Sequence, residues 1–214
     1  MNDENIPIIE RKIIKMYSHD FLTKIYTFFR LKLSPIAKIE KYVPKSGNIL
    51  DLGCGTGIFA NILYLGSQER TILGVDLMNE RIKTAKKISK KKPQLQFIVG
   101  DVSNVELDVF EIVTLIDLLH HMPFSKQDNL LKRIFINLRK GGLVLIKDLE
   151  KNPNWKYIFH CIQDFISYKG SKLYFRSAEE MESLLMDIGF KVEIISLASA
   201  YPHPHVLYRC IKKI

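Results

Sequence analysis

The chain has 214 residues, of which 47% are hydrophobic and 26% charged, and its formal net charge is +9. This length allows one domain with a sizeable core, and the composition is ordinary for a globular protein. The sequence has no basic and apolar leader and no apolar run of 18 residues, so we expect neither a signal peptide nor a membrane span. Three widely separated cysteines indicate neither a disulfide framework nor a metal pair, which favours a reducing cytoplasm.

Much of the positive charge lies in one lysine-rich segment, at Lys86, Lys87, Lys90, Lys91 and Lys92. Such a cluster can bind nucleic acid or an anionic membrane. It is also typical of the solvated end of a surface helix, because cations interact favourably with a helix C-terminus. We favour the second interpretation, since aromatic residues do not alternate with the lysines as a base-stacking surface requires.

Residues 1–46 are predicted to form a helical N-terminal cap. Apolar side chains recur every three or four residues there, for example at Ile13, Tyr17, Phe21 and Ile25. The dipeptide Ser34-Pro35 should interrupt this segment, because proline restricts the residue before it and suits the start of a new helix.

From residue 48 onward the predicted strands and helices alternate. The predicted strands are Asn48–Leu52, Thr71–Val75, Leu95–Val99, Ile112–Asp117, Leu143–Lys147, Lys191–Leu197 and Val206–Ile211. The predicted helices are Ile58–Leu65, Asn79–Lys90, Lys126–Leu138 and Ala178–Ile188, the last with a capping box at Ser177 and Glu180 and a stop at Gly189. This alternation predicts an α/β fold, a Rossmann-like, doubly wound, seven-stranded and mostly parallel sheet with helices on both faces. Ligands of such sheets bind beyond the carboxyl ends of the strands.

A glycine-rich turn follows the first predicted strand, in the sequence Asp51-Leu52-Gly53-Cys54-Gly55-Thr56-Gly57. Three glycines within five residues indicate a sharp bend or a close approach of backbone to ligand. The G-x-G-x-G spacing differs from the G-x-G-x-x-G of dinucleotide-binding turns. Asp76 ends the second strand, where an acid can accept ribose hydroxyls; alternatively, it only caps the helix that begins near Asn79.

The turn at residues 51–57 resembles motif I of the class I S-adenosylmethionine-dependent methyltransferases. Asp76, the segment Gly100-Asp101-Val102 and the segment Asp117-Leu118-Leu119-His120-His121 follow in the order of that family, and the resemblance extends over residues 48–148. It is to the small-molecule branch, which includes ubiquinone and menaquinone methyltransferases. The resemblance implies S-adenosylmethionine as cofactor, with the turn at its methionine part, Asp76 at its ribose and Asp101 at its adenine. The implied cofactor-binding residues are Asp51, Gly53, Cys54, Gly55, Gly57, Asp76, Leu77, Asp101, Val102 and Asp117.

Two histidines after the fourth strand are the candidates for a catalytic base. Methyl transfer needs alignment of the reactants rather than a fixed triad, but a hydroxyl acceptor gains from a general base. We place His120 ahead of His121, because it occupies the histidine position of the resembling motif, and a structural role for both stays open. His203 and His205, on a stiff loop before the last strand, could line the same opening. We expect no metal site, because these histidines lack a carboxylate or cysteine at suitable spacing.

The expected organisation is one methyltransferase domain over residues 1–214, with the cap at 1–46, a cofactor-binding core at 47–148, a lid insertion at 149–176 and a C-terminal helix and strand pair at 177–214. The cap and the lid are rich in aromatic residues, and Asn154–Tyr168 has an apolar stripe at helical spacing. We therefore expect a small aromatic or lipid-like acceptor, methylated on oxygen or carbon. Basic residues nearby would permit contact with a carrier protein or an anionic membrane.

Two other classes of function are compatible with the fold. A nucleic-acid methyltransferase would suit the positive charge, but amino-methylating enzymes of that kind carry a Pro-Pro-aromatic sequence where this chain has Leu118-Leu119-His120. A non-catalytic partner protein could keep the fold without the activity, although the intact glycine turn and Asp76 argue against that.

Overall fold

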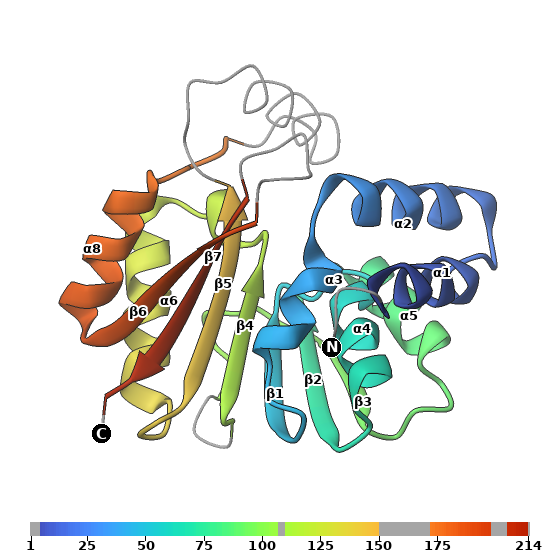
Figure 1. Ribbon diagram of the computed structural model, residues 1–214, viewed down its shortest axis with the longest axis horizontal. Helices are drawn as coiled ribbons and strands as arrows, with labels where there is room; N and C mark the ends of the chain where they lie inside the picture. Colours follow the sequence, from blue (N-terminus) through green and yellow to red (C-terminus); the bar gives the residue numbers. More distant parts are fainter. Residues whose placement is uncertain (1–4, 107–109, 150–171, 198–204, 214) are drawn as a thin grey trace. The chain divides into compact units, whose positions relative to one another are not determined.

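The computed structural model describes residues 5–106, 110–149, 172–197 and 205–213 (Figure 1). The chain divides into two compact units, Met1–Thr114 and Leu115–Ile214. Seven strands form one sheet in the order β3-β2-β1-β4-β5-β7-β6. β2 is parallel to β1 and β3, whereas β7 is antiparallel to β5 and β6. The predicted fold, a mostly parallel Rossmann-like sheet with seven strands, is confirmed.

The first unit begins with the predicted helical segment. It contains α1 (Ile6–Met16), α2 (Phe21–Leu33), α3 (Ile36–Ile39) and a short 3-10 turn (Glu40–Tyr42). The predicted break at Ser34-Pro35 is confirmed. A second break between α1 and α2 was not predicted, and it arises because the Asp20 side chain accepts a hydrogen bond from the Thr23 N–H at the start of α2.

The rest of this unit alternates strand and helix. Its elements are β1 (Gly47–Leu52), α4 (Ile58–Gly66), β2 (Arg70–Asp76), α5 (Asn79–Ile88) and β3 (Leu95–Val99). In the parallel register Leu52 lies opposite Val75, and Asp76 lies opposite Val99. The carboxyl ends of β1, β2 and β3 therefore meet at one edge of the sheet, where the glycine-rich turn begins.

The second unit contains the antiparallel part of the sheet. After β4 (Ile112–Ile116), which crosses the boundary between the units, come the 3-10 turn η3 (Leu119–His121), α6 (Phe124–Asn137), β5 (Leu143–Leu149), α8 (Ala178–Ile188), β6 (Phe190–Ser196) and β7 (His205–Lys212). Both bonds of the capping box at Ser177 and Glu180 are present, and Gly189 ends α8 with φ 114°. The predicted start and stop of this helix are confirmed.

The position of His205 differs from the prediction. His205 is the first residue of β7, opposite Leu149, and not part of a preceding loop, because β7 begins one residue earlier and β5 ends two residues later than predicted. The apolar stripe of Asn154–Tyr168 and His203 lie outside the described residues. Among the helices that the structure describes, none has the length and apolar character needed to cross a bilayer.

Candidate active site

The glycine-rich turn in the first unit is bent tightly over the end of β2. The N–H groups of Gly53 and Cys54 both donate to the Val75 carbonyl, at 2.8 and 3.0 Å, and the Gly57 N–H donates to the Cys54 carbonyl at 2.9 Å. Gly53, Gly55 and Gly57 all have positive φ, of 70°, 55° and 79°. Side chains other than glycine disfavour this region, so the glycine spacing encodes the path of the backbone.

Two of these glycines have different surroundings. A Cβ atom at Gly57 would lie 2.9 Å from the Phe97 ring, so packing between α4 and β3 requires glycine there. A Cβ atom at Gly55 would meet no atom of the described residues within 4 Å. This open space among the described residues allows a ligand to approach the turn closely at Gly55.

Asp76 links the turn to the start of α5. Its Oδ2 accepts a hydrogen bond from the Gly55 N–H at 2.9 Å, and its Oδ1 accepts one from the Met78 N–H at 2.8 Å. The N-cap position of α5 is Met78, without a side-chain capping bond, so Asp76 is not a simple helix cap. The carboxylate is nearly buried and each oxygen retains a second lone pair for a ligand hydroxyl.

Asp51 is a buried acid with one unused oxygen. The Thr114 hydroxyl donates to its Oδ1 at 2.7 Å, whereas its Oδ2 has no hydrogen-bond partner among the described residues. Burial raises the pKa of Asp51 to about 7; the Thr114 hydrogen bond opposes this rise and the Asp76 charge adds to it. An unpaired buried carboxylate oxygen costs free energy, and a cationic ligand group would remove that cost. The unpaired oxygen of Asp51 and the open space at Gly55 therefore fit a cofactor that has positively charged groups.

The remaining predicted cofactor residues in this unit lie around the same strand ends. The Gly100 N–H donates to the Asp76 carbonyl at 3.1 Å, so the loop with Asp101 and Val102 begins beside Asp76. Asp101 is exposed, and its carboxylate accepts a hydrogen bond from the Ser103 N–H at 2.9 Å. Leu77 is 72% exposed. Their roles as cofactor residues stay predictions.

A buried polar network lies behind the turn, and the sequence patterns did not indicate it. The Tyr17 hydroxyl donates to the Thr56 carbonyl at 2.8 Å and accepts a hydrogen bond from the Asn61 side chain at 3.1 Å. The same Asn61 amide donates to the Gly57 carbonyl at 2.8 Å. Tyr17 and Asn61 are fully buried, and burial raises the pKa of Tyr17 far above its usual range, so it stays protonated. The end of α1 thus fixes the turn from its protein side.

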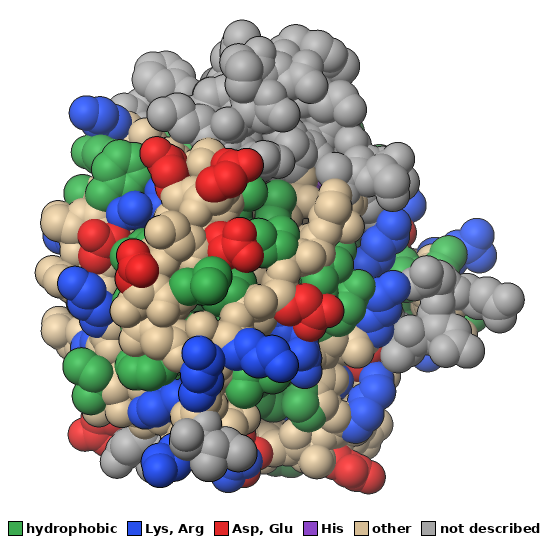
Figure 2. Space-filling view, turned by 60° about the vertical axis from the view of Figure 1, so that its left-hand side comes forward, with side chains coloured by type: hydrophobic (Ala, Val, Ile, Leu, Met, Phe, Trp, Pro, Cys, Tyr) green, Lys and Arg blue, Asp and Glu red, His purple; other side chains and the backbone are tan. Residues whose placement is uncertain are grey.

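The lysine-rich segment is only partly the solvated surface that we expected. Lys86, Lys87, Lys90 and Lys91 are exposed, as predicted. Lys92 instead turns inward, where its ammonium group donates to the Asn61 side-chain oxygen at 2.5 Å and burial lowers its pKa to about 8. Figure 2 draws the side of the molecule on which α8 lies in Figure 1, and there acidic and basic side chains are interspersed on the described part of the surface.

In the second unit, Asp117 forms a buried ion pair with Lys147 of β5. Asp117 has φ 55°, and no other described residue except glycine has positive φ. Its N–H donates to the Lys147 carbonyl at 2.8 Å. Lys147 therefore neutralises the acid that follows β4, a partner that no sequence pattern indicated. Binding of cofactor by Asp117 stays a prediction.

His120 is also paired with a residue of β5. Its Nδ1 lies 2.5 Å from Asp148 Oδ1, and both side chains are buried. The imidazole stacks on the Phe175 ring with 5.0 Å between centroids, and the His121 ring lies at 4.2 Å. Asp148 follows Lys147 directly, so these adjacent residues of β5 pair with His120 and Asp117, two of the polar residues after β4. Sequence reasoning found the histidines but missed Asp148, because the two partners are 28 residues apart.

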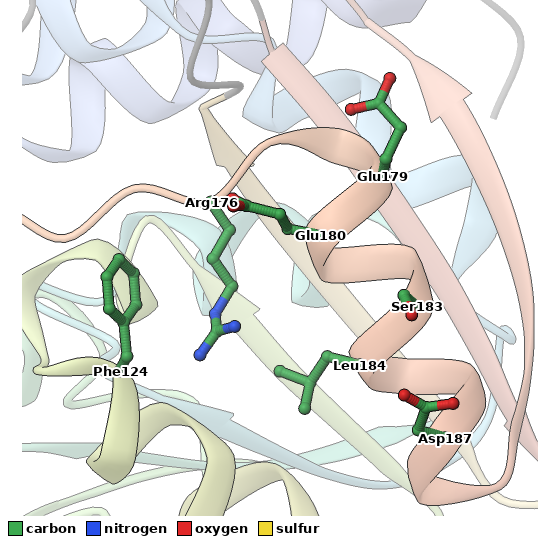
Figure 3. Close-up of a pocket in the computed structure, with 7 residues that line it drawn as sticks. All are labelled: Phe124, Arg176, Glu179, Glu180, Ser183, Leu184 and Asp187. Atoms are coloured by element: carbon green, nitrogen blue, oxygen red, sulfur yellow. The ribbon is translucent and has the colours of Figure 1, made fainter.

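The second unit also has an open groove of about 650 Å³ between α8 and the start of α6 (Figure 3). Acidic side chains line it, including Glu179 and Asp187. Arg176 stacks on the Phe124 ring at 4.7 Å and pairs with Asp128 at 2.6 Å. No predicted site residue lines this groove, and no group of three or more metal-binding side chains occurs in the part of the chain that the structure describes.

Comparison with known proteins agrees with this geometry. Carboxy-S-adenosyl-L-methionine synthase of Campylobacter concisus is 26% identical over 194 residues, which cover 80% of this chain and 82% of that protein. The mitochondrial ubiquinone biosynthesis O-methyltransferase of Saccharomyces cerevisiae is 30% identical over 103 residues, 46% of this chain and 32% of that protein. The solved structure of magnesium protoporphyrin IX methyltransferase from Synechocystis PCC 6803, with bound SAH, has the same fold, with a TM-score of 0.69, 14% identity and coverage of 96% of this chain and 93% of that one. The family model for the methyltransferase domain matches residues 24–194. The chain therefore belongs to the methyltransferase domain family and is a class I S-adenosylmethionine-dependent enzyme.

Proposed function

We propose that this enzyme transfers the methyl group of S-adenosylmethionine to an oxygen atom of a small apolar acceptor, with His120 as general base. The observation that supports this is the buried pair of His120 and Asp148. A histidine with a carboxylate behind it is a recurrent device for taking a proton from a hydroxyl group. The name of the yeast relative also denotes O-methylation.

On this proposal, the first unit holds the cofactor. The open turn at Gly55 and the unpaired oxygen of Asp51 suit its charged amino-acid part, and Asp76 suits its ribose hydroxyls. Asp101 and Val102 would meet the adenine, as the family resemblance implies. When bound, S-adenosylmethionine supplies a methyl group activated by a sulfonium.

His120 then acts on the acceptor. Asp148 accepts the Nδ1–H of the neutral imidazole, which makes Nε2 the nitrogen that can accept a proton. As the acceptor oxygen attacks, its proton moves to Nε2, and the Asp148 carboxylate stabilises the imidazolium that forms. The Phe175 ring stacked on the imidazole fixes its plane and keeps water from that face.

The test is the variant His120→Ala, assayed by formation of S-adenosylhomocysteine with a panel of phenols and lipid quinols. We expect kcat to fall by about 10²-fold or more, with the affinity for S-adenosylmethionine unchanged in calorimetry. His121→Ala is the matched control, since it removes the adjacent imidazole and keeps both members of the His120–Asp148 pair, and it should keep most of the activity. A wild-type kcat for His120→Ala would exclude the general-base role.

A second reaction is suggested by the similarity to carboxy-S-adenosyl-L-methionine synthases. The product named for those relatives is a carboxylated S-adenosylmethionine, so the cofactor itself is modified and does not lose its methyl group to an acceptor. Mass spectrometry of the nucleoside recovered after turnover separates the two reactions. Recovery of S-adenosylhomocysteine together with a methylated acceptor supports methyl transfer. Recovery of a heavier, carboxylated cofactor would instead show that the enzyme catalyses this second reaction.

A further inference from the structure

The helix α2 exposes most of its large apolar side chains. Its exposed apolar residues are Phe21 at 74%, Leu22 at 76%, Ile25 at 37%, Tyr26 at 50%, Phe28 at 43% and Phe29 at 51%. Single exposed apolar residues are normal on a protein surface, but a contiguous group of this size marks an interaction site. No other helix or strand that the structure describes exposes so many.

The amphipathic pattern of α2 is inverted. The side of α2 that packs against the rest of the first unit contains Thr27 and Leu31, which are buried, and Thr23, which is half-buried. The Thr27 hydroxyl donates to the Thr23 carbonyl at 2.8 Å, so the polar group on the packed side is satisfied within the helix. In an ordinary surface helix the apolar stripe faces the core. Here folding buries the smaller, more polar side and leaves the aromatic side for a partner.

The charges of α2 indicate which partner. Between residues 21 and 33 the helix has three basic residues, Lys24, Arg30 and Lys32, and no acidic residue. Lys32 pairs with Glu10 at 2.9 Å, yet its side chain is still 52% exposed. Aromatic and aliphatic side chains flanked by cations are the pattern of a helix that lies in the interface of an anionic bilayer.

We propose that α2 docks this enzyme on an anionic membrane surface, with Phe21, Leu22, Tyr26 and Phe29 entering the interface. The proposal does not depend on which acceptor is methylated. It would give the enzyme access to acceptors that are dissolved in the bilayer, as the expectation of a lipid-like substrate requires. A helix of this kind binds reversibly, because neither its apolar area nor its charge alone suffices for a permanent anchor.

Co-sedimentation of the full chain with vesicles tests the proposal. We expect binding to phosphatidylcholine vesicles that contain phosphatidylglycerol, weaker binding to phosphatidylcholine alone, and weakening of the former by salt. Leu22→Asp and, separately, Phe29→Asp should each reduce binding by about tenfold, because a carboxylate would enter the apolar interface. Ile136→Asp is the matched control, since Ile136 is 72% exposed and the other exposed large apolar side chain described on α6, Phe124, lies at the opposite end of that helix, and it should bind as the wild type does.

Three outcomes would overturn the proposal. The first is an absence of vesicle binding by the wild type, and the second is an equal loss of vesicle binding in Leu22→Asp and Ile136→Asp. The third is that the wild type binds no vesicles but self-associates in analytical ultracentrifugation, and that Leu22→Asp abolishes this self-association. The last outcome would assign the face to a second copy of the chain. Calorimetry with S-adenosylmethionine on the same variants keeps the two proposals separate. Loss of vesicle binding with normal cofactor binding and turnover would overturn only the membrane proposal. Vesicle binding without cofactor binding or turnover would overturn only the proposed function.

Discussion

The two ends of strand β2 have buried charged side chains with different kinds of partner. At the amino end, Arg70 is fully buried and donates hydrogen bonds to the Glu40 carboxylate and to the carbonyls of Val43, Pro44 and Leu63, at 2.7–2.8 Å. At the carboxyl end, Asp76 bonds two backbone N–H groups and lies near Asp51, which keeps one oxygen without a described partner.

This difference separates a structural cluster from a binding one. Arg70 bonds four groups of its own chain, so it ties the segment after α3 to the sheet. The carboxylates at the other end have acceptor capacity left over, which a ligand with donors or positive charge can use. Burial alone did not distinguish the two clusters; the cations Arg70 and Lys45 beside Glu40, in contrast to the neighbouring acids Asp51 and Asp76, did.

The largest effect should follow from breaking the amino-end cluster. Arg70→Met removes the buried cationic partner of Glu40 and should lower the free energy of unfolding by about 3–5 kcal/mol, measured by urea denaturation. Arg209→Ala, which breaks the exposed pair with Glu193, should cost no more than about 1 kcal/mol. Equal effects of the two variants would contradict the structural role of Arg70.

The pH dependence of stability tests Asp51. Its pKa is about 7 in the folded protein, against about 4 when unfolded, so the folded state holds the extra proton between these values. Stability should therefore fall as the pH rises from about 4 to about 7. The variant Asp51→Asn should not lose stability in this pH range, because its side chain does not titrate. The difference in the free energy of unfolding between this variant and the wild type should therefore grow with pH, to a limit of about 4 kcal/mol. Urea unfolding at several pH values measures it, and a difference independent of pH would show that Asp51 titrates normally.

A smaller effect is expected on cofactor affinity at the carboxyl end. Asp76→Ala removes an acceptor of charged hydrogen bonds and should weaken S-adenosylmethionine binding by about 1–3 kcal/mol in calorimetry. Asp76→Asn keeps a side-chain oxygen for one backbone N–H and should give an intermediate loss. Unchanged affinity in Asp76→Ala would remove this residue from the cofactor site.

The smallest effect should come from the network behind the glycine turn. Tyr17→Phe leaves the Thr56 carbonyl without its donor and should cost about 1 kcal/mol of stability. Hydrogen exchange of the amides in residues 53–57 should become faster, because the turn loses its link to α1. Tyr26→Phe is the matched control, since its side chain is 50% exposed, and it should leave the exchange rates unchanged. No change in Tyr17→Phe would mean that the glycines alone fix the turn.

The sequence predicted the elements whose signals are local. The turn at Gly53–Gly57, the capping box at Ser177 and the stop at Gly189 lie where they were expected, because each depends on the backbone preferences of a few neighbouring residues. The break before Asp20 was missed, since the apolar spacing of Tyr17 and Phe21 continues through it and conceals the N-cap.

The candidate site was predicted residue by residue, but not as pairs. Asp51, Asp76 and His120 were found from their positions after strands, whereas Thr114, Lys147 and Asp148 were not, because the sequence does not state which residues the sheet brings together. Likewise, Lys92 could not be separated from its exposed neighbours until the fold placed it against Asn61.

The sequence by itself thus determined the fold family, the cofactor turn and the identity of the polar residues at the strand ends. These follow from local conformational preference and from the period of apolar residues. Only the tertiary structure decided which buried charges pair with one another, that His120 has a carboxylate behind it, and that α2 turns its aromatic side outward. Those properties depend on contacts between residues distant in sequence and on the free energy of burying them together, which a local pattern does not contain.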